Sequence, residues 1–262
     1  MDVSIILVTY NSEKYVSNCL NSLVKAFQNI EHEIFIIDNQ SIDQTKRLIK
    51  ECGNSAVLIE NNENWGFARA VNIGLKKSSG EFILLINPDI IVNSDSLLPL
   101  IDFMRKNPKI GICGGRLENE DGSLQYSKGS FPSLSSTIFR TFLPRPMRKY
   151  HLWGYNKRGK CDWVTGSFML TRKCLMEEIG GLDENYFVYY EDVDYCLQIQ
   201  KRGWLTYYFP ETTASHLNPH AISKRTIEIE NEIRKSRLYY FKKNHSIIPY
   251  GVLRILTWMS KA

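Results

Sequence analysis

Short apolar runs alternate with amphipathic segments along the first 115 residues, and this alternation limits the possible folds more than any other feature. The runs have the length and composition of buried β-strands, at 3–10, 33–38, 56–60, 81–87 and 109–115. Between the first two, apolar residues recur at helical spacing: Val16, Leu20, Leu23 and Phe27. Strands and helices that alternate in this way predict βαβ units and a mainly parallel sheet flanked by helices.

Polar residues mark where the predicted helices begin. Asn11 and Ser12 offer N-cap side chains to a first helix that runs to about residue 27, and Ser41 and Asp43 open a second. Further helices are predicted over 67–77, from Ser94 or Asp95 to about Asn107, over 192–201 and over 227–243. Further strands are predicted over 161–171 and 204–210.

The composition of the 262 residues, 43% hydrophobic and 23% charged, is typical of a globular protein. No apolar stretch reaches the roughly 20 residues of a spanning helix, and the N-terminus lacks the features of a signal peptide. The six cysteines show no CxxC pair and no zinc-ligand spacing with histidine. We therefore expect a cytoplasmic protein with reduced thiols.

Basic residues gather in two segments. Residues 140–160 hold seven Lys/Arg and no acid, and residues 221–262 hold nine Lys/Arg and three Glu. The net charge is only +5, so the rest of the chain is acidic. This distribution favours an anionic partner, either a phospholipid surface or a pyrophosphate. Nucleic acid is not expected, because no nucleic-acid-binding motif is present. Solvated surface charge is the alternative for either segment.

The first glycine of the chain is Gly53, which excludes a glycine-rich phosphate loop after the first strand. Neither the dinucleotide-binding fingerprint nor the P-loop is therefore possible there. This also argues against sugar nucleotidyltransferases. A nucleotide bound at this sheet would need side chains and a metal ion instead of a backbone cradle.

Polar clusters follow three of the predicted strands: Thr9-Tyr10-Asn11, Asp38-Asn39-Gln40-Ser41 and Asn87-Pro88-Asp89. A fourth, Glu191-Asp192-Val193-Asp194, opens a helix after the aromatic run 186–190. Each alone could be a turn or a helix cap. Together, three clusters at the carboxyl edge of one sheet predict a ligand site.

Several stretches carry a resemblance to a known family: VSIILVTYNS, IFIIDNQSIDQT, NWGFARAVNIGLKKSSGEFILLINPD, DWVTGSFMLTRK, GGLDENYFVYYEDVDYCLQIQKRGW and ETTASHLN. The chain resembles family 2 inverting glycosyltransferases of the GT-A fold, from about residue 3 to residue 245. Within that family it resembles bacterial dTDP-rhamnosyltransferases of polysaccharide assembly, such as O-antigen or capsule synthesis. NWGFARAVNIG and YYEDVDYC are the specific signals, and the opening TYN alone is weak.

The resemblance implies a role for each matching residue. The catalytic pair is Asp192, the base, with Glu191. The donor site comprises Thr9, Tyr10, Asn11, Asp38, Asn64, Gly66, Phe67, Arg69, Asn87 and Asp89. Trp163 and Gly166 face the acceptor, with core packing as the alternative for Trp163. A divalent cation, Mg²⁺ or Mn²⁺, is held by Asp89 and His216, and a strand-end structural role is the alternative for His216.

The chemistry of sugar transfer agrees with these implied roles. A nucleoside diphosphate leaving group needs its charge neutralised, which a divalent cation supplies. A carboxylate beside the anomeric carbon takes the proton of the acceptor hydroxyl. Repulsion from Glu191 and Asp194 is expected to raise the pKa of Asp192. Asn87 departs from the family's Asp-x-Asp, which weakens the metal site, and Asn-Pro-Asp favours the rhamnose subgroup.

The expected function is transfer of L-rhamnose from dTDP-L-rhamnose to a polyprenyl-pyrophosphate-linked saccharide. The alternatives are a UDP-hexose or UDP-N-acetylhexosamine donor, a non-catalytic nucleotide-sugar-binding scaffold, and a soluble transferase acting on protein or a small molecule. The expected organisation is a nucleotide-sugar-binding half (1–115), an acceptor-binding and catalytic half (116–220) and a basic amphipathic helical tail (221–262).

The tail carries Ile248, Val252, Ile255 and Met259 at helical spacing, with Leu256 and Trp258 adding apolar surface. The cations Lys242, Lys243, Arg254 and Lys261 lie close in sequence. This pattern predicts a peripheral contact with the inner face of the cell membrane. Packing of the tail on the body of the protein is the alternative.

Overall fold

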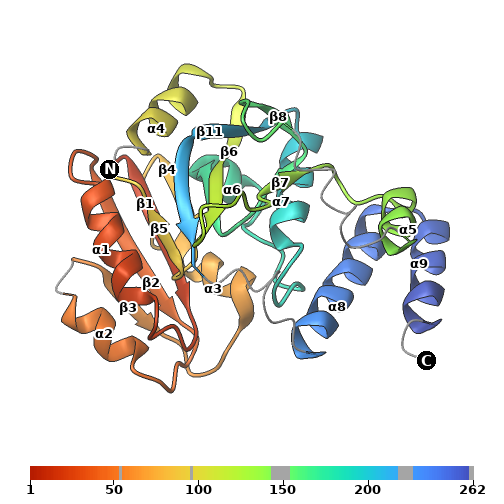
Figure 1. Ribbon diagram of the computed structural model, residues 1–262, viewed down its shortest axis with the longest axis horizontal. Helices are drawn as coiled ribbons and strands as arrows, with labels where there is room; N and C mark the ends of the chain where they lie inside the picture. The colour runs from red at the N-terminus through yellow and green to blue at the C-terminus, as the bar shows by residue number, and fades with distance from the viewer. Residues whose placement is uncertain (53–54, 95–96, 143–153, 218–226, 260–262) are drawn as a thin grey trace.

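The computed structural model describes residues 1–52, 55–94, 97–142, 154–217 and 227–259. A twisted sheet lies between two layers of helices, and three helices form a lobe at one end (Figure 1). The strands of the main sheet are β1 (Val3–Thr9), β2 (His32–Asp38), β3 (Val57–Glu60), β4 (Phe82–Ile86), β5 (Ile90–Val92), β6 (Ile110–Asn119), β8 (Gly159–Cys161), β10 (Phe168–Arg172) and β11 (Leu205–His216). A small second sheet pairs β7 (Lys128–Gly129) with β9 (Trp163–Val164).

The main sheet runs in the order β3-β2-β1-β4-β10-β6-β11-β5, and β8 pairs with β11. Its first four strands are parallel, as the alternating pattern predicted. The chain then adds antiparallel pairings that the pattern did not predict. β10 lies antiparallel between β4 and β6, and β5 and β8 pair antiparallel with β11. The α/β fold is confirmed, and its sheet is mixed beyond β4.

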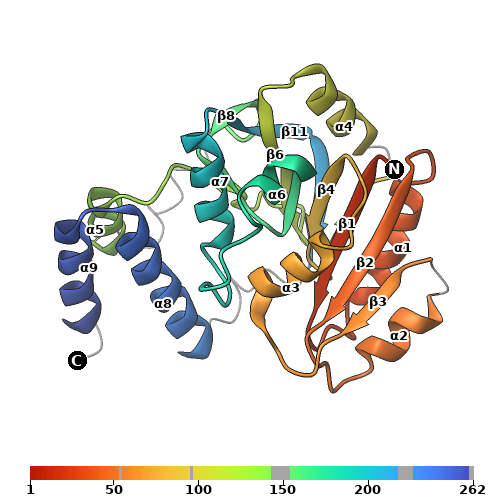
Figure 2. The same ribbon diagram turned by 180° about the vertical axis from the view of Figure 1, so that it is seen from behind.

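Helices cover both faces of the sheet. One face carries α1 (Val16–Ala26), α2 (Thr45–Glu51) and α4 (Leu97–Lys106), whose apolar sides pack with Ile5, Leu7 and Leu84. The other face carries α3 (Gly66–Leu75), α6 (Lys173–Glu178) and α7 (Glu191–Lys201), seen from behind in Figure 2. The central strands are buried on both sides, which agrees with their composition: β4 consists of Phe, Ile and Leu alone, and β1 is Val, Ile and Leu except at Ser4 and Thr9.

The lobe consists of α5 (Leu134–Phe142), α8 (Ile227–Asn244) and α9 (Ile247–Met259). A third apolar cluster attaches it to the body, because Tyr240 and Phe241 of α8 and Leu253 of α9 pack with Tyr186 and Val193. The opposite side of α9 is apolar and exposed. Part of the predicted tail therefore packs on the protein, and part does not.

Two predicted boundaries were wrong because backbone N–H groups in those segments bond side chains from elsewhere in the chain. The first helix begins at Val16, not after Ser12. Asn11 and Ser12 bond the next loop instead: Ser41 Oγ accepts from Asn11 N at 2.9 Å, and Thr45 Oγ1 accepts from Ser12 N at 2.7 Å. The strand predicted over 161–171 is interrupted at 165–167, where backbone groups serve the site described below.

Some predictions fall outside the described residues. They include Asp95 as a helix cap, the basic residues Arg145, Arg148 and Lys149, and Lys261. The side chains of Trp258 and Met259 also lie outside the described part of the chain. All six cysteines are free thiols, as predicted. In the described part of the chain, no helix is both long and apolar enough to cross a membrane.

Candidate active site

The carboxyl ends of β1 and β2 are joined by a buried carboxylate. Asp38 accepts hydrogen bonds from Thr9 Oγ1 at 2.9 Å, from Ser41 Oγ at 2.6 Å and from Ser41 N at 2.8 Å. The side chains of Thr9 and Asp38 are fully buried, whereas Tyr10 and Asn11 are exposed. Of the residues implied at the nucleotide base, Tyr10 and Asn11 therefore offer surface, and Thr9 and Asp38 hold the loops that carry them.

A second link fixes the start of α3. Asn39 Nδ2 donates to the carbonyl oxygen of Gly66 at 3.0 Å, and Asn64 Oδ1 accepts from Gly66 N at 3.0 Å. Gly66 has φ +78°, and a Cβ placed there would lie 2.3 Å from the carbonyl oxygen of Phe187. That same oxygen accepts from Phe67 N at 2.7 Å. Only glycine fits this contact between the donor-site segment and the loop that precedes Asp192.

Arg69 lies on the exposed side of α3. Its guanidinium stacks 3.9 Å from the centroid of the Trp65 ring and lies 4.0 Å from Glu184. Both Arg69 and Glu184 are about half exposed, so this ion pair is weak. The guanidinium is therefore exposed and only weakly engaged by the carboxylate of Glu184.

Asp89 and His216 meet because β5 pairs with β11, which places His216 opposite Ile90. Their atoms Oδ1 and Nε2 are 3.2 Å apart, and both side chains are buried. Gln125 Oε1 lies 3.0 Å from His216 Nδ1. Gln125 therefore fixes the orientation of the imidazole ring, with Nε2 facing Asp89.

This pair fits one side of a divalent-cation site. Apart from this contact with His216, Asp89 Oδ1 has no hydrogen-bond partner within the described residues, so the carboxylate keeps electron pairs that a cation could use. A carboxylate oxygen and an imidazole nitrogen suit Mn²⁺ or Mg²⁺, and Gln125 orients the imidazole as metal-bound histidines require. No described group of three or more His, Cys, Asp or Glu could hold a metal, so the ligand's phosphates would have to complete the site.

Asp192 stands at the first turn of α7, facing the interruption between β9 and β10. Its Oδ2 accepts from Gly166 N at 2.9 Å and its Oδ1 from Val193 N at 2.7 Å. A Cβ on Gly166 would lie 3.4 Å from both Asp192 Cβ and Phe67 Cε1. The structure thus brings together three predicted residues: Phe67 of the donor site, Gly166 of the acceptor site and the base.

Burial raises the pKa of both acids at the start of α7. For Glu191 it does so strongly, because this side chain is buried, Oε2 has no partner in the described chain, and Asp192 adds repulsion. The pKa of Asp192 is raised mainly by burial, while the backbone N–H groups of Gly166 and Val193 stabilise its charged form. Of the two acids, Asp192 therefore loses its proton more readily and is the one better suited to be a charged carboxylate.

The expected repulsion from Asp194 was wrong. Asp194 Oδ2 is 2.7 Å from Lys243 Nζ, and its Oδ1 accepts from Asn244 Nδ2 at 2.7 Å. The charge of Asp194 is thus neutralised from α8 and does not act on Asp192. Lys243 also lies 2.7 Å from Asp183, so it is an internal ion-pair partner and not one of the membrane-facing cations predicted for the tail.

Trp163 packs among apolar and aromatic side chains. Its Nε1 donates to the carbonyl oxygen of Ser130 at 3.0 Å, and its ring meets Tyr126 edge-on. It is partly buried between the second and third apolar clusters. These contacts are those of a packing residue, whereas Gly166 N bonds the Asp192 carboxylate directly.

Sequence reasoning missed Gln125, Phe187, Ser236 and Lys243. None lies in a polar cluster at a strand end, and each acts across more than 45 residues of sequence or through its backbone. The double left-handed conformation at Tyr189 and Tyr190, both with φ 69°, was also unforeseen. Bulky residues adopt it at a cost of about 1–3 kcal/mol each, which the surrounding contacts must offset.

Solved structures share this architecture. TarS of S. aureus, in complex with UDP-GlcNAc, superposes with a TM-score of 0.61 at 18% identity, covering 97% of this chain and 70% of that one. The mannosyltransferase PcManGT from Pyrobaculum calidifontis, in complex with GDP-Man and Mn²⁺, gives 0.60 at 14% identity, covering 99% and 80%. These likenesses confirm the GT-A fold.

Curated relatives match most of the chain. One from Mycobacterium tuberculosis, named N-acetylglucosaminyl-diphospho-decaprenol L-rhamnosyltransferase, is 26% identical, covering 92% of this chain and 84% of its own length. Rhamnosyltransferase WbbL of Escherichia coli is 28% identical, covering 83% and 84%. The family model described as Glycosyl transferase family 2 matches residues 4–179. Because this model covers more than half of the chain, the chain belongs to glycosyl transferase family 2.

Proposed function

We propose that this glycosyltransferase moves L-rhamnose from dTDP-L-rhamnose, with inversion, to a saccharide carried on a polyprenyl diphosphate. The names of the Mycobacterium tuberculosis and Escherichia coli relatives support the sugar, and the first of these names supports the acceptor. The observation that carries the chemistry is the carboxylate of Asp192, held by Gly166 N–H beside Phe67.

The reaction is a single displacement. The acceptor hydroxyl oxygen attacks C1 of the sugar, the bond from C1 to the diphosphate oxygen breaks, and dTDP leaves with that electron pair. Asp192 Oδ2 or Oδ1 takes the hydroxyl proton. The backbone N–H of Gly166 keeps the carboxylate aimed at the acceptor side, and attack opposite the leaving group inverts C1.

The donor is held by the loops at the carboxyl edge of the sheet. Tyr10 and Asn11 face the nucleotide, Arg69 faces its phosphates, and Asn64 and Gly66 shape the pocket beneath the sugar. Asp89 and His216 would hold the divalent cation, whose charge would offset that of the departing diphosphate. Asn87 leaves this site one carboxylate short, so we expect metal binding to be weak until the nucleotide contributes its own oxygens.

A donor screen tests the proposal. Purified protein is incubated with dTDP-rhamnose or UDP-sugars and a lipid-linked N-acetylglucosamine diphosphate, with Mg²⁺, Mn²⁺ or excess EDTA. We expect release of dTDP, a product of inverted anomeric configuration by NMR, and loss of turnover in EDTA.

Each part of the proposal has its own contrary result. Preferred turnover of a UDP-sugar would replace the donor. Full activity in EDTA would show that the reaction does not need the proposed cation. Turnover of none of these donors, with intact nucleotide binding, would leave a nucleotide-sugar-binding scaffold.

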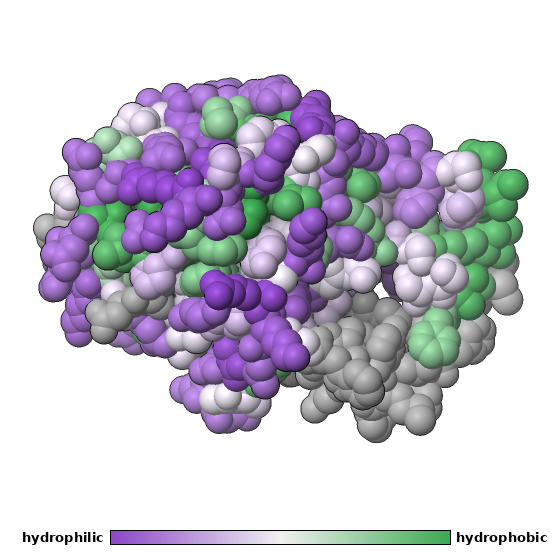
Figure 3. Space-filling model, turned by 90° about the horizontal axis from the view of Figure 1, so that it is seen from above, coloured by the Kyte–Doolittle hydropathy of each residue, from purple (hydrophilic) through white to green (hydrophobic). Residues whose placement is uncertain are grey.

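A peripheral membrane contact also belongs to this proposal. Ile248 and Ile255, two of the predicted apolar residues of the tail, are exposed on α9, as is Ile247. Figure 3 shows hydrophobic side chains gathered at the end of the molecule that α5 and α9 form. Such a surface, with Lys242 and Arg254 exposed nearby, suits the interface of an anionic membrane. The protein would then work on the inner face of the cell membrane, where the acceptor lipid is anchored.

A further inference from the structure

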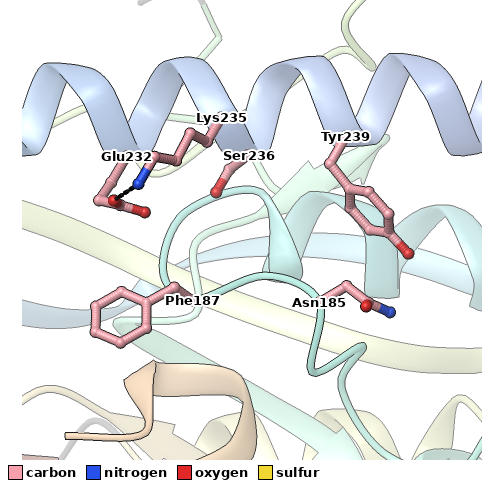
Figure 4. A pocket seen from close by; sticks show the side chains of 6 residues that line it. All are labelled: Asn185, Phe187, Glu232, Lys235, Ser236 and Tyr239. Atoms are coloured by element: carbon pink, nitrogen blue, oxygen red, sulfur yellow. Dashed lines mark hydrogen bonds and ion pairs between the residues drawn. The ribbon is translucent and has the colours of Figure 1, made fainter.

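A cavity lies between α8 and the loop that leads to Asp192. It has a volume of about 480 Å³ and is lined by Asn185, Phe187, Glu232, Lys235, Ser236 and Tyr239. Figure 4 shows four of these side chains hanging from α8 and two rising from the loop beneath it. The volume falls within the range of about 300–1,000 Å³ found for small-molecule sites.

The walls of this cavity are fixed by hydrogen bonds. Ser236 Oγ donates to the carbonyl oxygen of Val188 at 2.8 Å, and Tyr239 Oη donates to Asp183 Oδ2 at 3.0 Å. At the other side, the carbonyl oxygen of Phe187 accepts from Phe67 N. The cavity is therefore preformed, and one wall is shared with the donor-site segment at Gly66.

The lining matches a sugar better than an anion. Lys235 Nζ lies 2.6 Å from Glu232 Oε1, so the lining holds one cation and one carboxylate and carries no net charge. The ring of Phe187 is 43% exposed and offers an apolar face. The amide of Asn185 and the carboxylate of Glu232 offer acceptors to hydroxyl groups.

We propose that this cavity binds a sugar ring of the acceptor, and this inference rests on the function proposed above. Phe187 supplies the apolar platform, and Glu232 and Asn185 receive sugar hydroxyls. The position supports this role, because the Phe187 ring contacts the site of Gly66 and lies five residues before the base. The cavity also borders α8, which packs against α9, so a saccharide here lies between the catalytic loop and the exposed apolar surface.

Three variants test the cavity. Phe187→Leu keeps apolar packing against Gly66 but removes the ring, and Glu232→Gln removes the charge. Lys235→Trp fills the space from an exposed position, so it leaves the fold intact. Glu230→Gln, exposed on the same helix and outside the cavity, is the matched control.

Two measurements separate this inference from the proposed function. The difference in saturation-transfer NMR signal between wild type and Lys235→Trp, measured with free mono- and disaccharides that include N-acetylglucosamine, reports on the cavity. Donor hydrolysis by water reports on the donor site alone. We expect Phe187→Leu to weaken saccharide binding about two- to tenfold, and Lys235→Trp to abolish it with donor hydrolysis unchanged. The acceptor KM should rise in parallel.

The inference is overturned if wild-type protein gives no saturation transfer with any saccharide. It is equally overturned if the cavity variants bind saccharide as well as Glu230→Gln does. Failure of donor turnover alone, with saccharide binding intact, would instead count against the proposed reaction.

Discussion

At the scale of single residues, the two neighbouring acids at the start of α7 have different surroundings. Asp192 receives two backbone N–H groups, while Glu191 Oε2 receives none among the described residues. We expect Asp192→Asn to lower kcat by about 10²–10⁴-fold, the usual worth of a positioned base, without changing donor affinity. Glu191→Gln, which preserves shape, should retain most activity. Steady-state kinetics measures kcat, and donor titration measures donor affinity. Similar losses of kcat in both variants would contradict the separate roles of Asp192 and Glu191.

The same burial makes stability depend on pH. Because the pKa of Glu191 is higher in the folded state than its ordinary value of 4.5, folding favours its protonated form. Its stabilising contribution is complete below the unfolded pKa and is lost as pH rises toward the folded pKa. Glu191→Gln should therefore gain thermal stability over wild type progressively above pH 4.5. Melting curves from pH 4 to 8 measure this, and a constant difference would contradict it.

At the scale of elements, α8 acts as a clamp: it holds the loop 183–190, which leads to Asp192. Lys243 bridges Asp183 and Asp194, and Ser236 holds Val188, so both ends of the segment with the left-handed Tyr189 and Tyr190 are tied. We expect Lys243→Met to destabilise the protein by about 2 kcal/mol, less than the ~3–5 kcal/mol of a fully buried pair because the lysine is 30% exposed.

Its effect on activity follows from the loop. Lys243→Met should lower kcat while leaving donor affinity in place, Lys243→Arg should restore much of kcat, and Lys242→Met, at an exposed neighbour, should do neither. Urea unfolding and steady-state kinetics test both effects. Unchanged kcat in Lys243→Met would mean that the clamp serves stability alone.

The elements also show which parts of the fold and the site the sequence could predict. The alternation up to β4 depends on local periodicity, so the parallel strands and the strand-end clusters were predictable. His216 reaches Asp89 only through the antiparallel pairing of β11 with β5, which no local pattern encodes. The 161–171 segment has strand composition throughout, yet Gly166 N–H bonds Asp192 instead of a neighbouring strand. The resemblance to the family assigned these residues, and the geometry explains why they meet.

At the scale of the whole molecule, the exposed apolar side of α9 predicts vesicle binding. Replacing Ile247, Ile248 and Ile255 with Asn should weaken binding to anionic liposomes at least about a hundredfold, since each isoleucine contributes about 1.5–3 kcal/mol on full burial. Donor hydrolysis should persist. The matched control replaces three exposed apolar residues of the body, Val24, Val57 and Leu98. Co-sedimentation at low and high salt measures binding, and equal binding by both triple variants would refute the contact.

The position of β10 has a consequence for how the protein is made. β4 and β6 leave the ribosome first, but the strand that lies between them ends only at Arg172. Until then the nascent chain carries a parallel sheet whose last strand, Phe82–Ile86, is wholly apolar and has an open edge. Synthesis therefore passes through a stage at which pairing with another chain competes with pairing to its own later residues. Chaperone capture during translation should peak there and decline once β10 has emerged.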